Sequence, residues 1–262
     1  MTAYITYFRK SFKKNSAYRT TVWLQIVASL IQVGIQVAVW TALIGIGSVD
    51  GIDLDQMITY VILNAAMYAF ILTSLYKDVD ERLRSGDIAI DILRPARYPL
   101  LIMADSLGRA AYRMLFMVVP IVTVSSFLFG FSVPASFSAG TGFVIAIVLS
   151  ILISYSIGYL IALLSFWFLT TFHFSWAIGA LTTLFSGSFL PLWFFPEPWA
   201  TVAKMLPFQF LGFVPAAAWM GQLTGSELAM TFVVGVLWSA VLLMSTQVLW
   251  NRATRQLVVQ GG

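Results

Sequence analysis

The sequence predicts an all-α, polytopic membrane protein that forms one domain of 262 residues. Two observations lead to this prediction. First, 60% of the residues are hydrophobic and 10% are charged, whereas soluble domains carry about 25% charged residues. Second, uncharged runs longer than the roughly 20 residues that span a bilayer recur along the chain. The chain also lacks cysteine, which excludes disulfides and thiolate metal sites.

The first 20 residues form a basic segment with helical periodicity. Apolar residues recur at helical spacing at Ile5, Phe8 and Phe12, and four cations occupy the other side: Arg9, Lys10, Lys13 and Lys14. This pattern is typical of an amphipathic helix that lies in the headgroup layer of a membrane. A basic tail that only sets the topology would have the same composition, and the sequence leaves both interpretations open.

The first span is expected at 21–47, within a run that carries no charge. Polar residues spaced by 4, 3 and 4 positions lie on one helical face of this run: Gln25, Ser29, Gln32 and Gln36. Because amides that face lipid are costly, this face should point towards protein or towards a translocation pathway. The sequence leaves two roles open for Gln25, Gln32 and Gln36, which are hydrogen bonding between helices and a polar lining for a pathway.

Five further spans would follow, which gives six transmembrane helices; we expect them near 56–76, 114–133, 142–170, 174–195 and 228–250. In the fourth and fifth spans small residues recur every four positions, which predicts ridges where helices pack closely: Ser150, Ser154, Gly158 and Ala162, then Ser175, Gly179, Thr183 and Gly187. The segment 196–226 is also apolar, but Pro207 and Pro215 would break a helix there. We expect it to form an outer loop with short re-entrant helices, which must be covered by protein.

The distribution of positive charge predicts the topology. With six spans and the N-terminus inside, fourteen of the fifteen Lys and Arg residues lie in the cytoplasm, and Lys204 lies outside. If 205–226 crossed the membrane fully, Arg252 and Arg255 near the C-terminus would move outside. Both termini are therefore predicted to be cytoplasmic.

The segment 77–113 is a charged island between the second and third spans, with seven Lys or Arg and six Asp or Glu residues. Apolar residues are interleaved with these charges: Leu75, Val79 and Leu83 share a helical face, and Ile88, Ile90 and Ile92 follow. A solvated charged loop does not explain these apolar residues, whereas a surface that buries itself against a partner does. The sequence leaves both interpretations open. The part of the island that we expect to contact a partner is 78–95.

Several functions are disfavoured by what the sequence lacks. It contains no P-loop motif and one histidine, His173, so it offers neither that ATP site nor a His-x-x-x-His zinc pair. The hydrophobic parts of the expected spans carry no Asp, Glu, Lys or Arg, whereas ion-coupled carriers place ionisable groups there. A transporter built on this chain would therefore take its energy from another subunit. A stand-alone secondary carrier or channel is the alternative, and a membrane enzyme or scaffold is a third hypothesis.

The chain resembles the ABC-type-2 permease family, and most closely its six-span members that are encoded apart from their ATPase. Besides the basic start and long first span, two motifs carry this resemblance. Residues 81–87 (ERLRSGD) and 91–95 (DILRP) are similar to the Gly-Asp…Leu-x-Arg-Pro pattern between spans two and three. A proline-rich outer segment precedes the last span, with Pro191, Pro207, Pro215 and Gly221. Together these features cover essentially the whole chain.

The resemblance implies a half-transporter that works with other subunits. A second permease, identical or paralogous, would face this chain across the path, and two ABC ATPase subunits would bind beneath with ATP and magnesium. The loop between spans two and three would form a cytoplasmic coupling helix, in which we expect Glu81, Arg82, Arg84, Asp87 and Arg94 to contact the ATPase. The chain would hold no cofactor, metal or catalytic residue of its own.

The same resemblance implies the location and direction of transport. The complex would lie in the bacterial cytoplasmic membrane and act in efflux. An uncharged, aromatic-rich set of spans suits an apolar or amphipathic cargo, such as a drug-like molecule, a lipid or a peptide.

Overall fold

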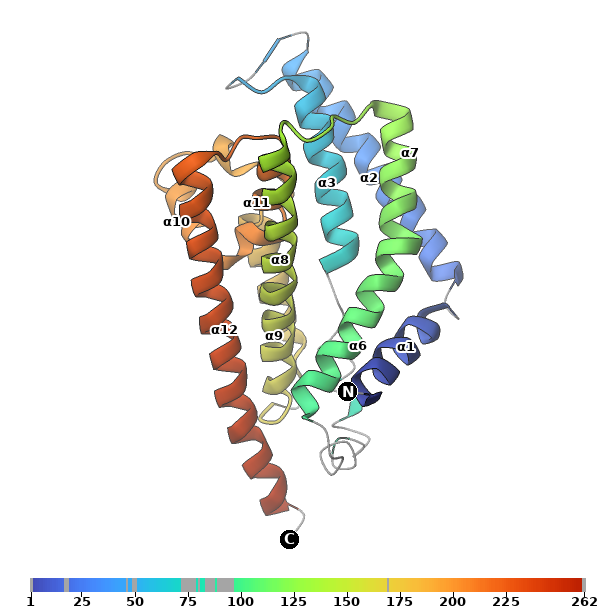
Figure 1. The fold of residues 1–262 in the computed structure, drawn as a ribbon, viewed down its shortest axis with the longest axis vertical. Helices are drawn as coiled ribbons and strands as arrows, with labels where there is room; N and C mark the ends of the chain where they lie inside the picture. Colours follow the sequence, from blue (N-terminus) through green and yellow to red (C-terminus); the bar gives the residue numbers. More distant parts are fainter. Residues whose placement is uncertain are drawn as a thin grey trace.

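The computed structural model of the chain describes residues 2–16, 19–45, 47–48, 51–71, 79, 81–82, 88, 97–168 and 170–260. These residues form an elongated bundle of α-helices (Figure 1). Most helices run along the long axis: α2 (Arg19–Ile44), α3 (Leu54–Ile71), α7 (Val119–Phe129), α8 (Phe137–Leu164), α9 (Phe172–Phe185) and α12 (Gly225–Gln260). Within the described residues, four helices are long and apolar enough to cross a membrane: Thr20–Ile44, Tyr98–Phe129, Phe137–Leu164 and Gly225–Arg255. The chain is a multi-pass membrane protein by this composition.

The helix Tyr98–Phe129 joins a polar half to an apolar half without a break. Its polar half is α6 (Tyr98–Arg113), which continues through a π-helical turn, η2 (Met114–Val118), into the apolar α7. The helix therefore begins well before the third span that the sequence predicts at 114–133. Pro99 explains this early start, because proline is favoured in the first turn of a helix, where its missing N–H costs nothing.

Three other helix ends differ from the expected span boundaries. Helix α8 starts at Phe137 rather than at 142, because the Ser136 hydroxyl accepts a hydrogen bond from the Ala139 N–H and caps it. Helix α8 also ends at Leu164, before the predicted 170. Helix α9 ends at Phe185 rather than at 195, because Gly187 follows with a φ of 77° that ends the helix. The chain then bends and forms a short 3-10 turn, η3 (Leu192–Phe194).

The proline-rich segment before α12 forms short helices and does not continue as one long helix. These are α10 (Trp199–Met205), the 3-10 helix η4 (Pro207–Leu211) and α11 (Phe213–Trp219). Pro207 begins η4, as its lack of an N–H favours. All of η4 and nearly all of α11 are buried, and they pack against α3 and α8 near one end of the bundle (Figure 1).

The main apolar core lies around these short helices. The Ser150 hydroxyl of α8 donates to the carbonyl oxygen of Phe210, and the Tyr60 hydroxyl of α3 donates to that of Gly187 at 2.7 Å. These bonds satisfy backbone oxygens that would otherwise be buried without partners. Part of the predicted small-residue ridge of the fourth span is buried, since Ser150 and Ala162 are fully enclosed.

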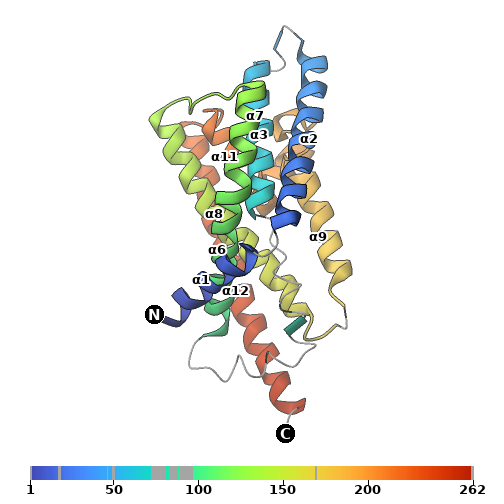
Figure 2. The same ribbon diagram turned by 90° about the vertical axis from the view of Figure 1, so that its right-hand side faces the viewer.

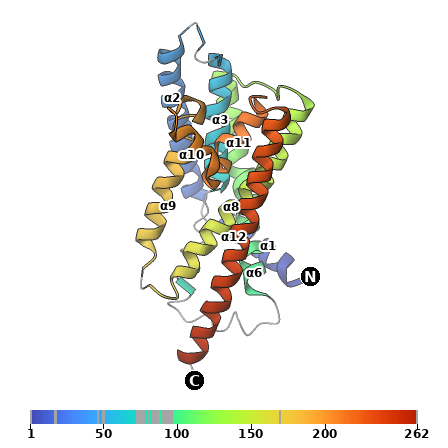
Figure 3. The ribbon, with the colours of Figure 1, turned by 90° about the vertical axis from the view of Figure 1, so that its left-hand side faces the viewer.

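Charged residues are divided between the two ends of the bundle. The basic residues of α1 (Thr2–Asn15), α6 and the C-terminal part of α12 lie at one end, where both termini are found (Figure 1). Of the Lys and Arg residues that the structure describes, Lys204 in α10 is at the other end. The two side views place α1 and α9 on opposite faces of the bundle (Figures 2 and 3). We call the end with the termini the inner end.

Candidate functional site

The part of the charged island that is assigned to coupling, residues 78–95, is described at four positions, which divide into two pairs. From this point the word island means these residues alone. Glu81 is exposed and Arg82 is half-buried, whereas Val79 and Ile88 are 0% and 1% exposed. The other predicted coupling residues, Arg84, Asp87 and Arg94, lie outside the described residues, as do Leu75 and Leu83. The described part of the island thus offers one charged side chain to solvent and holds two apolar side chains inside the protein.

Val79 and Ile88 are buried in a cluster of aromatic rings at the inner end, which we call the inner aromatic cluster: Tyr98 of α6, Tyr155 and Tyr159 of α8, Phe166 just after α8, and Trp250 of α12. Tyr98 stacks on Trp250, with ring centroids 4.9 Å apart and planes 12° apart. Tyr155 stacks on Tyr159 at 5.7 Å, and Tyr159 lies 6.4 Å from Trp250. The cluster therefore joins the island to α6, which follows it in the chain, and to α8 and α12, which are distant in sequence.

This burial corrects one part of the docking interpretation. The sequence suggests that the apolar residues interleaved with the charges bury themselves against a partner. For Val79 and Ile88 this expectation is wrong, because both are already buried within the chain. They fix the island to the bundle, so Glu81 is the described residue of the island that is exposed for a partner.

A second set of contacts joins α1 to α6 at the same end. Asp105 of α6 forms an ion pair with Arg109 at 3.1 Å and a hydrogen bond with Ser11 of α1. The positive charges of Arg82 and Lys14 also act on the Asp105 carboxylate. Asp105 thus interacts with the island, with α1 and with its own helix.

The amide face of α2 lies beside the buried stripe of that helix. The stripe consists of Ile26, Val33, Val37, Trp40 and Ile44. Gln25 and Gln32 are exposed and Gln36 is half-buried. Gly34 marks the opposite flank, where a Cβ atom would lie 3.8 Å from the Phe129 ring of α7. The three amides therefore face away from α7, and both roles that the sequence allows for them stay predictions.

Helix α9 is weakly packed against the rest of the described chain. Phe185 is its one buried residue, and Trp176 is 69% exposed. At Gly179 an added Cβ atom would meet nothing within 4 Å, and Thr183 is exposed. The part of the predicted ridge that lies on this helix therefore makes little contact with the described part of the chain. His173, at the start of α9, is exposed with its ring 5.8 Å from that of Phe172.

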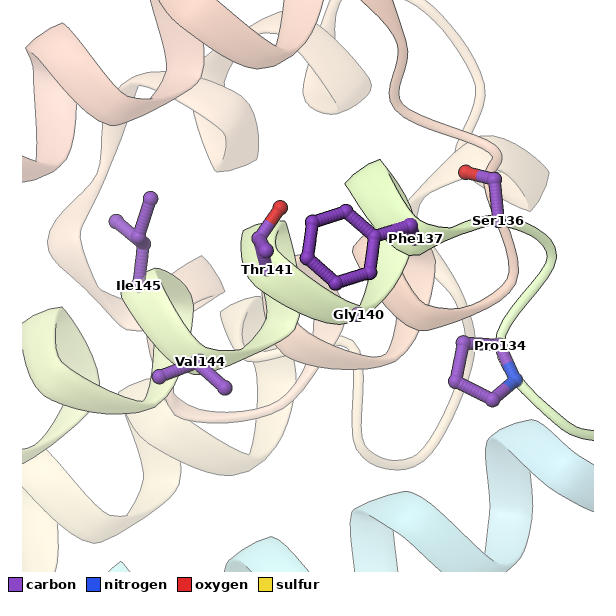
Figure 4. A pocket seen from close by; sticks show the side chains of 7 residues that line it. All are labelled: Pro134, Ser136, Phe137, Gly140, Thr141, Val144 and Ile145. Carbon is purple, nitrogen blue, oxygen red and sulfur yellow. The ribbon is translucent and has the colours of Figure 1, made fainter.

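An open apolar groove of about 740 Å³ lies at the outer end of α8 (Figure 4). Its lining comes from the first turns of α8 and the loop before it: Pro134, Ser136, Phe137, Gly140, Thr141, Val144 and Ile145. Because α8 is a candidate membrane span, lipid chains suit this surface better than a polar ligand. None of the site residues predicted from the sequence lies in it.

Nothing in the sequence singles out Tyr98, Tyr159 or Trp250 as members of a buried cluster. The only local hints are that Tyr155 and Tyr159 are four residues apart, on one helical face, and that Trp250 ends the last expected span. Aromatic residues at span ends ordinarily belong to the interfacial belt. Here they are buried in protein. Among the described residues, no group of three His, Asp or Glu side chains is placed to hold a metal ion.

A family model described as ABC-2 family transporter protein matches residues 26–261, which is nearly the whole chain. A search of curated proteins found no match.

Proposed function

Because the chain belongs to the ABC-2 family of transporter proteins, we propose that it is the permease subunit of an ATP-driven exporter. The match over residues 26–261 is the observation that carries this proposal. The family supplies the membrane component of a transporter and not an ATPase domain. ATP and magnesium would accordingly bind in a partner ATPase.

The topology that we propose has six spans and a cytoplasmic inner end. The spans are formed by α2, α3, the helix from α6 to α7, α8, α9 and α12. The division of charge supports this topology, because the basic residues of α1, α6 and α12 gather at one end of the bundle. The short helices η3, α10, η4 and α11 would dip into the outer side of the membrane and return. The burial of η4 and α11 against α3 and α8 supplies the protein cover that these two helices require.

The complex would contain a second permease, identical or paralogous, and two ATPase subunits. The exposed face of α9 and the amide face of α2 support the second permease, since both are largely exposed in the part of the chain that the structure describes. In this arrangement Gln25, Gln32 and Gln36 would face the partner permease or the path between the two chains. The cargo would be apolar or amphipathic, and transport would run outward across a bacterial cytoplasmic membrane.

The segment 78–95 would contact the ATPase and take up its movement when ATP binds. Glu81, Arg82, Arg84, Asp87 and Arg94 are the residues that we assign to this contact. The exposure of Glu81 and the anchoring of Val79 and Ile88 support the assignment. A contact surface that is fixed to the bundle can pass a movement on, whereas a free loop would absorb it.

The charge-reversal variant Glu81→Arg tests this function. We expect it to lower the amount of ATPase that co-purifies with a tagged permease by about fivefold or more, because it replaces an attractive contact by a repulsive one. Glu227→Arg, which reverses an exposed glutamate at the outer end, should leave co-purification unchanged. If the two variants behave alike, the coupling assignment is wrong. Transport driven by an ion gradient in ATP-free proteoliposomes would instead favour the stand-alone carrier.

A further inference from the structure

The inner aromatic cluster holds large rings in an unusual place for a membrane protein. Tyr98, Tyr155, Tyr159 and Trp250 lie at the inner end, where exposed aromatic residues normally contact lipid headgroups. Each of the four is less than a tenth exposed. They pack against one another and against Val79 and Ile88 of the island. The cluster is thus an internal joint between the island and the helices α6, α8 and α12.

The joint has the close packing that passes a movement from one element to the next. Val79 and Ile88 are fully enclosed, and the Tyr98 and Trp250 rings are stacked at 4.9 Å. The Tyr155 hydroxyl also donates to the Pro99 carbonyl oxygen at 2.8 Å, which fixes α8 to the start of α6. Closely packed side chains do not deform continuously, so a displacement of the island must move the rings against which it packs.

Helix α12 extends from this joint to the outer end of the bundle. It runs unbroken from Gly225 to Gln260, so Trp250 and Glu227 lie about 35 Å apart at a rise of 1.5 Å per residue. Near its outer end the Trp238 indole N–H donates to the carbonyl oxygen of Met205 at 2.8 Å. A shift of α12 at Trp250 would therefore reach the short outer helices.

We propose that Trp250 is a positioning residue that couples α12 to the ATPase, because movement of the island at Val79 and Ile88 reaches α12 through it. This inference rests on the proposed function. The ring acts through its stack on Tyr98 and its contact with Tyr159. Trp250 touches neither ATP nor cargo in this arrangement. Its replacement should uncouple α12 from the ATPase while α3, which precedes the island directly in the chain, still responds.

The absence of native cysteine allows a site-specific test in the full complex with its ATPase. Monobromobimane is attached at Glu227→Cys, on the first turn of α12, or at Asp55→Cys, on the first turn of α3; both positions are exposed. The ATP-induced change in bimane emission is measured at each label. In Trp250→Leu the change at position 227 should fall about fivefold or more, and the change at position 55 should persist. Trp250→Phe, which keeps a ring, should restore most of the response at 227.

Matched variants separate coupling from general loss of structure. Met244→Ala shortens an exposed side chain of the same helix outside the cluster and should leave both responses present. Val79→Ala loosens the cluster from the side of the island and should lower the bimane response at 227 by less than Trp250→Leu does. This variant tests the inference if Trp250→Leu does not assemble with the ATPase. An unchanged response at 227 in Trp250→Leu or Val79→Ala would overturn the inference about Trp250, as would equal losses at 227 and 55. Neither result would contradict the proposed function. If the unsubstituted complex binds no ATPase, the proposed function fails and the inference fails with it.

Discussion

At Gly108 the helices α1 and α6 touch through their backbones. A Cβ atom at this position would collide with the Phe8 carbonyl oxygen and would lie 3.0 Å from the Ser11 Cβ atom. Ser11 is buried and bonds to Asp105, so two small residues let the basic helix α1 lie close against α6. The position of α1 thus depends on the absence of a single methyl group.

The substitution Gly108→Ala tests this contact. We expect it to lower the free energy of unfolding by about 1–3 kcal/mol, because the added methyl group overpacks a backbone contact that cannot yield. Thermal unfolding of the detergent-solubilised protein, followed by tryptophan emission, measures the change. Gly34→Ala is the matched control, since its Cβ atom would meet only the Phe129 ring at 3.8 Å. Equal effects of the two substitutions would show that α1 does not pack closely on α6.

For single residues, the sequence indicates which side chains belong to a buried or an exposed surface more readily than it indicates which residues they contact. The alternation of charged and apolar residues indicates that the island is more than a solvated loop, and the burial of Val79 and Ile88 agrees with that. Their distant partners could not be predicted, because Tyr159 and Trp250 come from two other parts of the chain. Only the packing of the helices brings these rings together.

Helix α9 buries little of its apolar surface against the described part of the chain. It has 14 residues, and most of its apolar side chains are exposed, Phe172, Trp176 and Leu184 among them. Lipid alone can cover such a face. Its small residues at Ser175, Gly179 and Thr183 suit close approach of another helix, however, and among the residues that the structure describes nothing lies within 4 Å of a Cβ atom at Gly179.

The substitution Trp176→Ala tests whether a second permease covers α9. We expect it to weaken the permease pair by about tenfold, because large aromatic residues contribute most to interfaces between chains. Single-molecule photobleaching of labelled permeases in bilayers at graded protein-to-lipid ratios measures the pairing. Phe127→Ala on α7 serves as the control, because Phe127 is 89% exposed on another helix. Unchanged pairing in Trp176→Ala would place the interface elsewhere.

At the element scale, hydrophobicity predicts where helices occur but predicts their ends poorly. The apolar run continues past Phe185, so composition extends the fifth span to 195. The helix instead ends where Gly187 adopts a positive φ and its carbonyl oxygen binds Tyr60 of α3. That bond joins residues 127 positions apart, so no local sequence pattern predicts it. Proline is the better local signal, since Pro207 does begin a new helix.

For the whole molecule, the most informative property is the uneven distribution of charge. The sequence places fourteen of its fifteen basic residues on one side of a six-span topology. In the structure α1, α6 and the C-terminal part of α12 meet at one end, and α10 with Lys204 lies at the other (Figure 1). Composition could predict this division because charged residues are excluded from the membrane interior whatever the helix packing. The arrangement of helices around the short outer helices needed the structure.

On our proposal, this chain is half of a membrane pathway that a separate ATPase drives. Native mass spectrometry of the complex, purified in mild detergent through a tag on this chain, measures its subunit composition. We predict two permease chains, of one or two kinds, together with two copies of an ATP-binding ABC subunit. A tagged chain that is recovered alone, without any ATPase, from membranes that transport normally would contradict the claim.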